Sequence, residues 1–548
     1  MPKPNEVPLS PISFLNRAAD IYPEKTAIVA GSGASVPYRE LRSRAVRLAN
    51  ALQAEDVQAS GSVVAILAPN DLHLLEAHFG APAAKASLVA LNVRLASAEY
   101  ATILRHCRAK VLIVDRSLVE RVTPIIDELP DLKLLVEIGD DCPSVGFRDY
   151  EEWIAAEDDT GSLELPASES DPITINYTSG TTGAPKGAVY THRGAYLNAL
   201  GQAIELGLAP ESVYLWTLPM FHCNGWCFTW AVTALGATHI ALRKFDGGGA
   251  LRLIQEQGVT HFCGAPVVLS EIAQYASRAG AALPHRVRAA TGGAPPSPTV
   301  LAAMESLGVD VLHLYGLTET YGPSIACERQ PAWDGFSIRE LADAMSRQGV
   351  RTVNVESVRV VDDRMEDVKP GSEMGEIVIR SNTVFDRYLD APDETERAFR
   401  GGWFHTGDLA VVHPDGYVEV RDRAKDVIIS GGENVSSIEV ESALLSHPDV
   451  LEAAVVAQPH SKWGEVPVAF VAIREDGSEI EEAELIEWVR ARLAHFKAPK
   501  TVAFCQLPRT STGKIRKTEL RRVAQRQVAE SDVKTSGLDG ERSERDGS

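Results

Sequence analysis

The stretch Tyr177-Thr178-Ser179-Gly180-Thr181-Thr182-Gly183-Ala184-Pro185-Lys186-Gly187 follows a strand-like run over residues 173–177. Its glycines permit backbone conformations that bring N–H groups up to an anion, and its hydroxyl side chains add short donors. Lys186 adds a positive charge. The stretch therefore predicts a loop that grips nucleotide phosphates, with hydroxyls that help to orient a magnesium ion. A plain polar surface loop is the competing interpretation, which the position between a strand and Lys186 disfavours.

The loop is not the standard P-loop of nucleotide hydrolases. That motif requires glycine immediately before its lysine and serine or threonine after it. Here the two positions hold Pro185 and Gly187.

Length and charge narrow the class of protein. The 548 residues exceed a single typical core, so we expect two or more domains. A net charge of −21 argues against nucleic acid or an anionic membrane as a partner, because either would be repelled. No apolar run is long enough to span a bilayer, and the start of the chain lacks the apolar core of a secretory signal. These features predict a cytoplasmic protein.

The seven cysteines are scattered along the chain and odd in number. They form neither a disulfide framework nor a paired zinc spacing. A metal site at His222, Cys223, Cys227 and Cys263 is an alternative, but their spacing fits no common site and their neighbours are aromatic, so we expect buried thiols there.

Strand-like and helix-like segments alternate along the first three quarters of the chain. The pattern predicts strands at 26–30, 63–67, 87–91, 111–114, 132–138, 259–263, 287–291 and 311–314, and helices at 14–22, 72–85, 100–106 and 193–206. Residues 331–348 are expected to be helical. Alternation of this kind predicts an α/β class with parallel-type sheets and flanking helices.

Three further segments offer groups for ligand binding. Residues 218–230 contain four aromatic side chains and His222, either as an ordinary aromatic core or as part of a pocket. Gly292-Gly293-Ala294-Pro295 ends a strand, where glycines allow close approach of a flat ligand. Tyr315-Gly316-Leu317-Thr318-Glu319 offers a ring, a hydroxyl and a carboxylate, and a carboxylate suits a hard cation that bridges phosphate oxygens.

These segments, together with Thr406-Gly407-Asp408, residues 421–426 and residues 508–515, resemble in order the motifs of the adenylate-forming superfamily. That superfamily includes acyl-CoA synthetases, adenylation domains of peptide synthetases and beetle luciferases. By this resemblance, ATP or AMP would be bound by Thr178, Ser179, Gly180, Thr181, Thr182, Gly183, Lys186, Gly293, Ala294, Pro295, Tyr315, Gly316, Thr318, Asp408, Arg423 and Lys514. The catalytic residues would be Lys514, Glu319, Thr182 and His222, with Glu319 and Thr182 on the metal.

The resemblance also implies the remaining sites. The acyl pocket would be lined by His222, Trp226, Cys227 and Gly293. Ser430, Gly431, Gly432 and Glu433 would line the CoA tunnel, within a loop over residues 428–435. Lys425 would be the hinge between an N-terminal ATP- and acid-binding domain (1–424) and a small mobile α+β lid (425–530). Residues 531–548 are polar and free of aromatics, so we expect a disordered tail. The chain departs from the family at Asp422, where many members have glycine.

The motifs are most similar to those of short- and medium-chain acyl-CoA synthetases of the methylmercaptopropionate-CoA ligase and plant acyl-activating type. The implied function is an AMP-forming acid:CoA ligase that uses ATP, Mg²⁺ and CoA on a short- or medium-chain carboxylic acid. An aryl acid such as benzoate or cinnamate is an alternative substrate. A stand-alone adenylation enzyme that loads a carrier protein and a non-catalytic relative are alternative functions. Dimers are common in the family, so a homodimer is possible.

Overall fold

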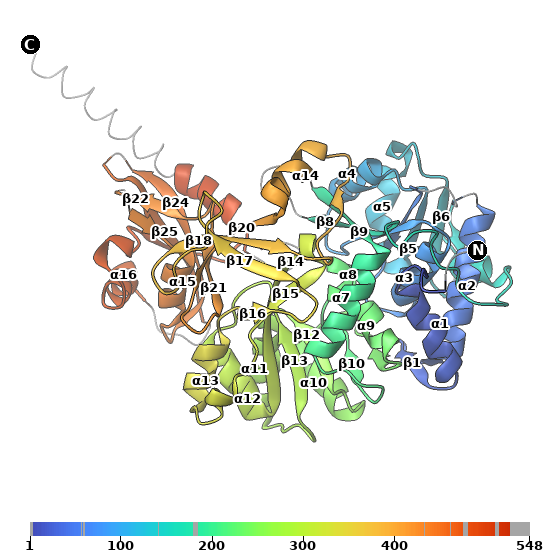
Figure 1. Ribbon diagram of the computed structural model, residues 1–548, viewed down its shortest axis with the longest axis horizontal. Helices are drawn as coiled ribbons and strands as arrows, with labels where there is room; N and C mark the ends of the chain where they lie inside the picture. Colours follow the sequence, from blue (N-terminus) through green and yellow to red (C-terminus); the bar gives the residue numbers. More distant parts are fainter. Residues whose placement is uncertain are drawn as a thin grey trace, which may run out of the picture. The chain divides into compact units, whose positions relative to one another are not determined.

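The structure is a computed structural model that describes residues 4–55, 57, 61–140, 142–178, 185–431, 433–460, 462–474, 480–509 and 515–526. The chain divides into two compact units (Figure 1). The N-terminal unit comprises Met1–Arg359, Val378–His405 and Asp415–Val418. The C-terminal unit comprises Val360–Ile377, Thr406–Pro414 and Glu419–Ser548. A hinge at Lys425 stays a prediction.

The larger sheet of the N-terminal unit has nine strands in the order β16-β15-β14-β13-β12-β10-β11-β1-β2. Its strands are β1 (Thr26–Val29), β2 (Ser35–Pro37), β10 (Val213–Leu215), β11 (Thr238–Ile240), β12 (His261–Gly264), β13 (Val287–Thr291), β14 (Val309–Leu317), β15 (Gly322–Ala326) and β16 (Val350–Arg351). The pairs from β1 to β14 are parallel, and β2, β15 and β16 add antiparallel edges. Parallel pairing aligns the carboxyl ends of β13 and β14 at one edge.

The second sheet has the order β19-β9-β8-β4-β3-β5-β6-β7. Its strands are β3 (Val63–Leu67), β4 (Ser87–Ala90), β5 (Val111–Asp115), β6 (Leu134–Ile138), β7 (Arg148–Asp149), β8 (Pro172–Thr178), β9 (Lys186–Thr191) and β19 (Arg387–Tyr388). β3 and β5 are buried at every residue, as expected for strands covered on both faces. Only the β9 pairings with β8 and β19 are antiparallel among the pairs that the structure describes here.

Helices cover these sheets. They are α1 (Ile12–Ile21), α2 (Tyr38–Ala54), α3 (Leu72–Ala83), α4 (Ser97–Cys107), α5 (Val119–Val122), α6 (Tyr150–Ala155), α7 (His192–Glu205), α8 (Cys223–Trp226), α9 (Phe228–Ala234), α10 (Gly247–Glu256), α11 (Pro266–Ala279), α12 (Pro298–Leu307), α13 (Ile338–Met345) and α14 (Pro392–Ala398). Side-chain caps start several of them, such as Asp246 at α10 and Ser297 at α12. The predicted α/β class is confirmed.

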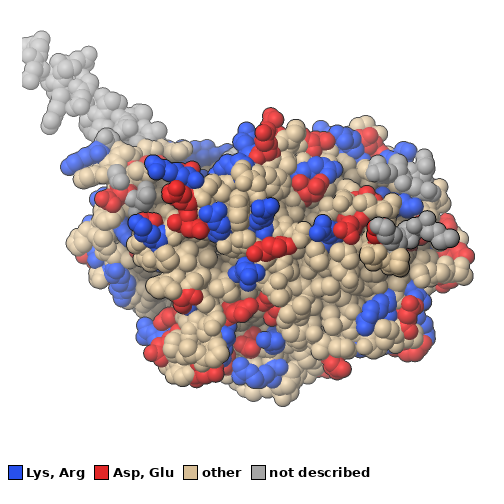
Figure 2. Space-filling view, in the orientation of Figure 1, with Lys and Arg blue, Asp and Glu red and all other residues tan. Residues whose placement is uncertain are grey.

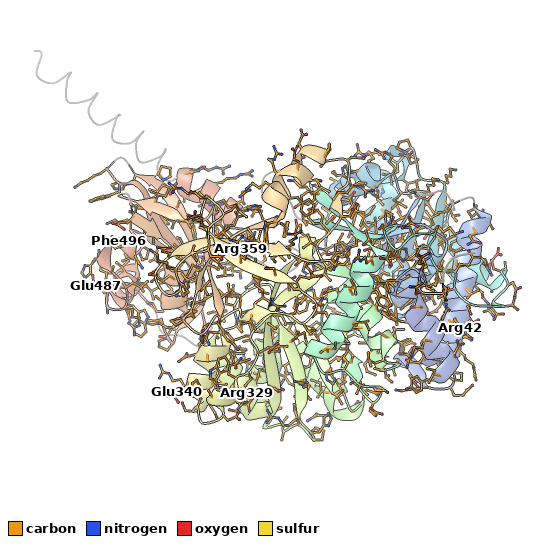
Figure 3. All side chains as sticks on the ribbon, viewed as in Figure 1. Arg42, Arg329, Glu340, Arg359, Glu487 and Phe496 are labelled. Atoms are coloured by element: carbon orange, nitrogen blue, oxygen red, sulfur yellow. The ribbon has the colours of Figure 1, made fainter. Side chains whose placement is uncertain are left out.

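The helix expected over residues 331–348 is wrong in its extent. Pro331–Trp333 forms only a 3₁₀ turn, and α13 begins later because the Ser337 hydroxyl accepts the backbone N–H of Glu340. The Glu340 side chain in turn accepts the N–H of Ser337, which completes a capping box. The end of α13 carrying Glu340 is labelled in Figure 3, together with nearby Arg329.

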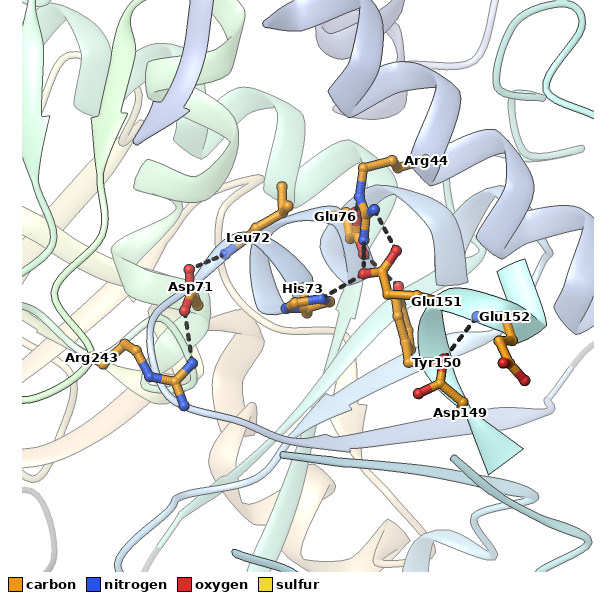
Figure 4. Close-up of polar contacts among 10 residues, drawn as sticks. All are labelled: Arg44, Asp71, Leu72, His73, Glu76, Asp149, Tyr150, Glu151, Glu152 and Arg243. Carbon is orange, nitrogen blue, oxygen red and sulfur yellow. Dashed lines mark hydrogen bonds and ion pairs between the residues drawn. The ribbon is translucent and has the colours of Figure 1, made fainter. Parts of the chain in front are cut away.

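The helices α2, α3 and α6 are joined by a network of charges (Figure 4). Arg44 on α2 donates to both carboxylate oxygens of the fully buried Glu76 on α3, at 2.7 and 3.1 Å. It also donates to Glu151 on α6 at 2.7 Å. The Tyr150 hydroxyl donates to Glu76 at 2.5 Å, and His73 bonds Glu151 at 2.9 Å. The network compensates the burial of Glu76, which alone would be costly.

The C-terminal unit contains a five-stranded sheet with the path β23-β22-β25-β24 and with β26 on β25. Its elements are β22 (Ile428–Ser430), β23 (Glu433–Val435), α15 (Ser437–Leu445), β24 (Val450–His460), β25 (Gly464–Ile473), α16 (Glu482–Arg490) and β26 (Val502–Phe504). The predicted α+β composition is confirmed. A further sheet has the order β17 (Ser357–Val361), β18 (Met374–Arg380), β20 (Phe404–Val412) and β21 (Val418–Arg423).

The loop expected over residues 428–435 is wrong, because β22 and β23 pair there as a short antiparallel hairpin. Ile428 lies opposite Val435, and both side chains are fully buried. Their burial in the core of the C-terminal unit fixes the hairpin.

One face of the surface carries charges of both signs, and most of the cysteines are buried. On the face drawn in Figure 2, acidic and basic side chains are interspersed. Five cysteines are buried, as expected, whereas Cys142 in the N-terminal unit and Cys505 in the C-terminal unit are exposed. Within the described ranges, no helix is both long and apolar enough to cross a membrane.

Candidate active site

The predicted phosphate loop joins β8 to β9. The last residue of β8, Thr178, pairs across the ladder with the first residue of β9, Lys186. Ser179, Gly180, Thr181, Thr182 and Gly183 lie outside the described residues. The hairpin therefore places the backbone of Lys186 at the base of the predicted loop.

The two predicted adenine motifs end neighbouring parallel strands. Gly293, Ala294 and Pro295 follow β13 and are exposed. Tyr315 and Gly316 lie in β14, next to the 3₁₀ turn Thr318–Thr320 that carries Glu319. A Cβ atom on Gly316 would stand 1.8 Å from the Gly322 carbonyl oxygen, so only glycine fits there. Parallel register thus brings both motifs to one edge, where ligands bind in open α/β sheets.

Residues of β9 connect that edge to the phosphate hairpin. The Tyr190 hydroxyl donates to the Thr318 carbonyl at 2.5 Å, and its ring stacks on Tyr321 with centroids 3.9 Å apart. The Tyr321 hydroxyl accepts the backbone N–H of Thr191 at 2.7 Å. These contacts join the two sheets of the N-terminal unit at the predicted site.

A left-handed turn lies inside the aromatic segment. Cys223, Asn224, Gly225, Trp226 and Cys227 have φ values of 48°, 47°, 59°, 54° and 65°. Residues other than glycine rarely adopt this left-handed backbone conformation, because it costs them about 1–2 kcal/mol per residue. Strain of this kind persists only where the surroundings impose it, and it concentrates at functional sites.

The side chain of Asn224 holds the turn. Its Oδ1 accepts from Thr174 Oγ1 at 2.7 Å and from Asn176 Nδ2 at 2.5 Å, and its Nδ2 contacts His78 Nε2 at 2.9 Å. Because His78 Nδ1 lies 2.6 Å from the Leu74 carbonyl, it is the donor there and Nε2 accepts from Asn224. Burial lowers the pKa of His78 to about 4, so the neutral ring persists at pH 7.

The turn contains two of the predicted acyl-pocket residues, Trp226 and Cys227. Trp226 is 6% exposed, and its indole would lie 3.1 Å from a Cβ atom on Gly292 and 3.1 Å from one on Gly322. Glycine at both positions makes room for this ring. The Cys227 thiol is fully buried and donates to the Tyr321 carbonyl at 3.6 Å. Half-buried His222 precedes Cys223, whose sulfur donates to the Thr318 hydroxyl at 3.4 Å. The pocket roles of His222, Trp226, Cys227 and Gly293 stay predictions.

Tyr388, which the sequence analysis did not single out, contacts two of the predicted site residues. Its hydroxyl donates to Glu319 Oε1 at 2.7 Å, and the Lys186 ammonium nitrogen lies 5.1 Å from its ring centroid. The residue lies in the two-residue strand β19, which pairs with β9. A strand this short carries no periodicity that would reveal it in the sequence.

Glu319 also fits the predicted magnesium role. Among the residues that the structure describes, no group of three or more His, Cys, Asp or Glu side chains could hold a metal ion. Magnesium bound with nucleotide phosphates needs only one or two protein carboxylates, because phosphate oxygens and waters supply the remaining ligands. The Glu319 carboxylate, which is bonded to the tyrosine that Lys186 faces, suits a site of that kind. Thr182, the other predicted ligand, lies outside the described ranges.

The C-terminal unit carries the predicted ribose and hinge residues. Arg423 Nε lies 3.1 Å from Asp408 Oδ1, and Asp408 is 4% exposed. Lys425 is exposed two residues after Arg423. The Lys514 loop lies outside the described residues. The pairing holds the Asp408 carboxylate at the start of the predicted hinge.

The structure explains the departure at Asp422. This buried carboxylate accepts the Ser437 N–H at 2.5 Å and its hydroxyl at 3.0 Å, at the start of α15. A negative charge at a helix N-terminus is stabilising. Burial raises the pKa of Asp422, opposed by nearby Lys517. Asp422 in β21, close to the predicted hinge, is thus hydrogen-bonded to the start of α15.

The predicted CoA-tunnel residues lie on the β22–β23 hairpin. Ser430 is buried, whereas Gly431 and Glu433 are exposed. The Gly431 N–H donates to the Trp463 carbonyl at 2.8 Å. Gly432 lies outside the described residues.

Known proteins are similar to the chain over nearly its whole length. Residues 15–389 match the AMP-binding enzyme family and residues 439–514 match the AMP-binding enzyme C-terminal domain. The chain is 42% identical over 540 residues to the acetate–CoA ligase CCL3 of Humulus lupulus, covering 94% of this chain and 95% of that protein. It is equally identical, with the same coverage, to the peroxisomal acetate/butyrate–CoA ligase AAE7 of Arabidopsis thaliana.

A solved structure of a CoA ligase has the same fold. The anthranilate CoA ligase AuaEII in complex with anthranoyl-AMP superposes with a TM-score of 0.85 at 26% identity, covering 96% of this chain and 100% of that one. The predicted enzyme class, an AMP-forming acyl-CoA synthetase, is confirmed by these relatives. The chain therefore belongs to the AMP-binding enzyme family, the adenylate-forming superfamily whose motifs its sequence resembles.

Proposed function

We propose that this acid:CoA ligase activates short-chain aliphatic carboxylic acids. A carboxylate is a poor electrophile, so ATP first converts it to an acyl-adenylate. The carboxylate oxygen attacks the α-phosphorus and pyrophosphate leaves. The CoA thiol then attacks the acyl carbon, and AMP leaves as the thioester forms.

The names of the relatives carry the substrate proposal. CCL3 is named for acetate and AAE7 for acetate and butyrate, each at 42% identity over almost the full chain. The large, buried indole of Trp226 lies against Gly292. In this proposal that ring limits the depth of the acyl pocket and so favours a short acid.

The predicted residues take roles that match the charge changes. Lys514 and Lys186 screen the negative charge that meets at the α-phosphate during adenylation. Glu319 and Thr182 would hold magnesium, which supplies Lewis-acid screening of the phosphates when bound. Asp408 accepts the ribose hydroxyl protons, and Arg423 meets ribose or phosphate. After adenylation, rotation about Lys425 brings the Gly431–Gly432 face to the thiol.

Two further properties belong to the same proposal. A cytoplasmic location is the expectation from the sequence, whereas AAE7 is named as peroxisomal. A homodimer follows only from the family resemblance.

The test is AMP release with ATP and Mg²⁺ across acids from acetate to decanoate, plus benzoate and cinnamate, each with and without CoA. We expect CoA-dependent turnover that peaks among the shortest acids. A peak at octanoate or beyond would refute the short-chain proposal, and a peak on the aryl acids would favour that alternative. Acid-dependent pyrophosphate exchange without CoA turnover would point to a carrier protein.

The half-reactions are tested separately. Lys514→Ala should cripple adenylation and spare thioester formation from preformed acyl-AMP. Lys425→Pro should impair thioester formation more than adenylation, because proline restricts the backbone at the pivot. Equal losses in both steps for either variant would contradict its assigned role.

A further inference from the structure

We propose that Tyr388 is a positioning residue that aligns Glu319 and Lys186 for binding of ATP with its metal. The inference rests on the proposed roles of these two residues in adenylation. It adds a third side chain that links them, contributed by a segment far along the chain from both.

One tyrosine contacts both groups. Its hydroxyl lies 2.7 Å from Glu319 Oε1, the length of a good O–H···O bond to a carboxylate. Its ring faces the Lys186 ammonium nitrogen at 5.1 Å from the centroid, within the range of a cation–π contact. Tyr388 is therefore placed between the anion and the cation of the predicted site.

Backbone contacts hold the tyrosine in this position. Tyr388 pairs with Ala188 of β9, and the Leu389 N–H donates to the Gly187 carbonyl at 2.8 Å, next to Lys186. The Phe385 N–H donates to the backbone carbonyl of Glu319 at 2.8 Å. The same short segment is thus hydrogen-bonded to the backbone next to Lys186 and to the backbone of Glu319.

The hydrogen bond from the Tyr388 hydroxyl orients the Glu319 carboxylate. Donation to Oε1 sets the direction in which the other carboxylate oxygen points. A site that uses one protein carboxylate depends on that direction, and loss of an outer partner of a metal ligand typically costs 10–100-fold in metal affinity or activity.

Two variants separate the contacts. Tyr388→Phe removes the hydroxyl and keeps the ring that faces Lys186, whereas Tyr388→Leu removes both. The control is Tyr417→Phe, because Tyr417 in the same unit also uses its hydroxyl in hydrogen bonds, to Gln330 and the Glu328 carbonyl. Its partners are not residues of the predicted site.

The measurements are the Mg²⁺ dependence of acid-dependent ATP–pyrophosphate exchange, calorimetric binding of ATP with and without Mg²⁺, and thioester formation from preformed acyl-AMP. We expect Tyr388→Phe to raise the half-saturating Mg²⁺ concentration about tenfold and to weaken MgATP binding similarly. Tyr388→Leu should in addition weaken binding of ATP alone. Thioester formation should change less than twofold in both variants, and Tyr417→Phe should resemble the wild type.

Unchanged Mg²⁺ curves and unchanged MgATP binding in Tyr388→Phe would overturn the inference. Equal losses in both half-reactions with a lowered melting temperature would also overturn it, because they would indicate a purely structural role. If the wild type exchanged no pyrophosphate with any acid, the proposed function would fail, and calorimetry of MgATP binding would still decide the role of Tyr388.

Discussion

Replacing Asn224 with alanine tests whether the buried amide imposes the left-handed turn. The variant loses the bonds to Thr174, Asn176 and His78, in a site that is 1% exposed. The Thr174 hydroxyl hydrogen and His78 Nε2 are left without their partner, and each unsatisfied buried group costs about 1–3 kcal/mol. Alanine at φ 47° adds about 1 kcal/mol of strain relative to asparagine. The free energy of unfolding should fall by about 4 kcal/mol.

Asn224→Gly separates the two contributions. Glycine loses the same hydrogen bonds but adopts positive φ freely. The free energy of unfolding of this variant should therefore be about 1 kcal/mol higher than that of Asn224→Ala. Asn50→Ala is the control, because Asn50 on α2 donates one exposed side-chain bond to the Asp158 carbonyl. Urea unfolding measures all three, and the Michaelis constants for the acid and ATP are measured beside it.

The turn also positions Trp226, a predicted acyl-pocket residue, so both Asn224 variants should raise the Michaelis constant for the acid about tenfold and that for ATP by less. The reasoning is refuted if Asn224→Ala costs no more than Asn50→Ala. It is also refuted if Asn224→Gly is no more stable than Asn224→Ala, since the turn would then carry no strain.

Two further predictions concern stability. Glu76→Ala breaks the buried ion pair with Arg44 and should lower the free energy of unfolding by about 3 kcal/mol in thermal melts. The control is Glu24→Ala, which breaks an exposed ion pair and should leave the free energy of unfolding unchanged. Equal effects of the two variants would contradict the stabilising role of the Arg44–Glu76 network. Burial lowers the pKa of His192 to about 3, so the unfolded chain, with a pKa near 6.5, binds the extra proton first. Stability is therefore complete above pH 6.5 and should fall by about 1.4 kcal/mol per pH unit below it for each such histidine. His192→Gln should flatten that slope in melts at pH 7 and pH 5, whereas the exposed His495→Gln should not.

The sequence was sufficient where the signal is local. The alternating apolar runs predicted β13 at residues 287–291, with the same bounds in the structure. The glycines after it and the ring, hydroxyl and carboxylate of residues 315–319 predicted a ligand edge, because strand ends carry binding groups in α/β sheets.

The rest depends on contacts between distant segments. Nothing in Cys223-Asn224-Gly225-Trp226-Cys227 announces five positive φ values, because only one of these residues is glycine and the turn is imposed by side chains of α3 and β8. Tyr388 becomes a site residue only through the pairing of β19 with β9. The role of Asp422 likewise depends on a distant contact, because its hydrogen bond with Ser437 places it at a helix start.

The distribution of thiols offers a direct way to watch the two units. Cys142 and Cys505 are exposed, one in each unit, whereas burial raises the pKa of Cys107, Cys263 and Cys327 to about 12 and leaves them unreactive. Maleimide dyes should therefore attach to the unmodified protein at these two positions. Resonance energy transfer between them would then report the distance between the units during turnover. A step in transfer efficiency on adding ATP and acid, and a second on adding CoA, would record lid rotation in single molecules.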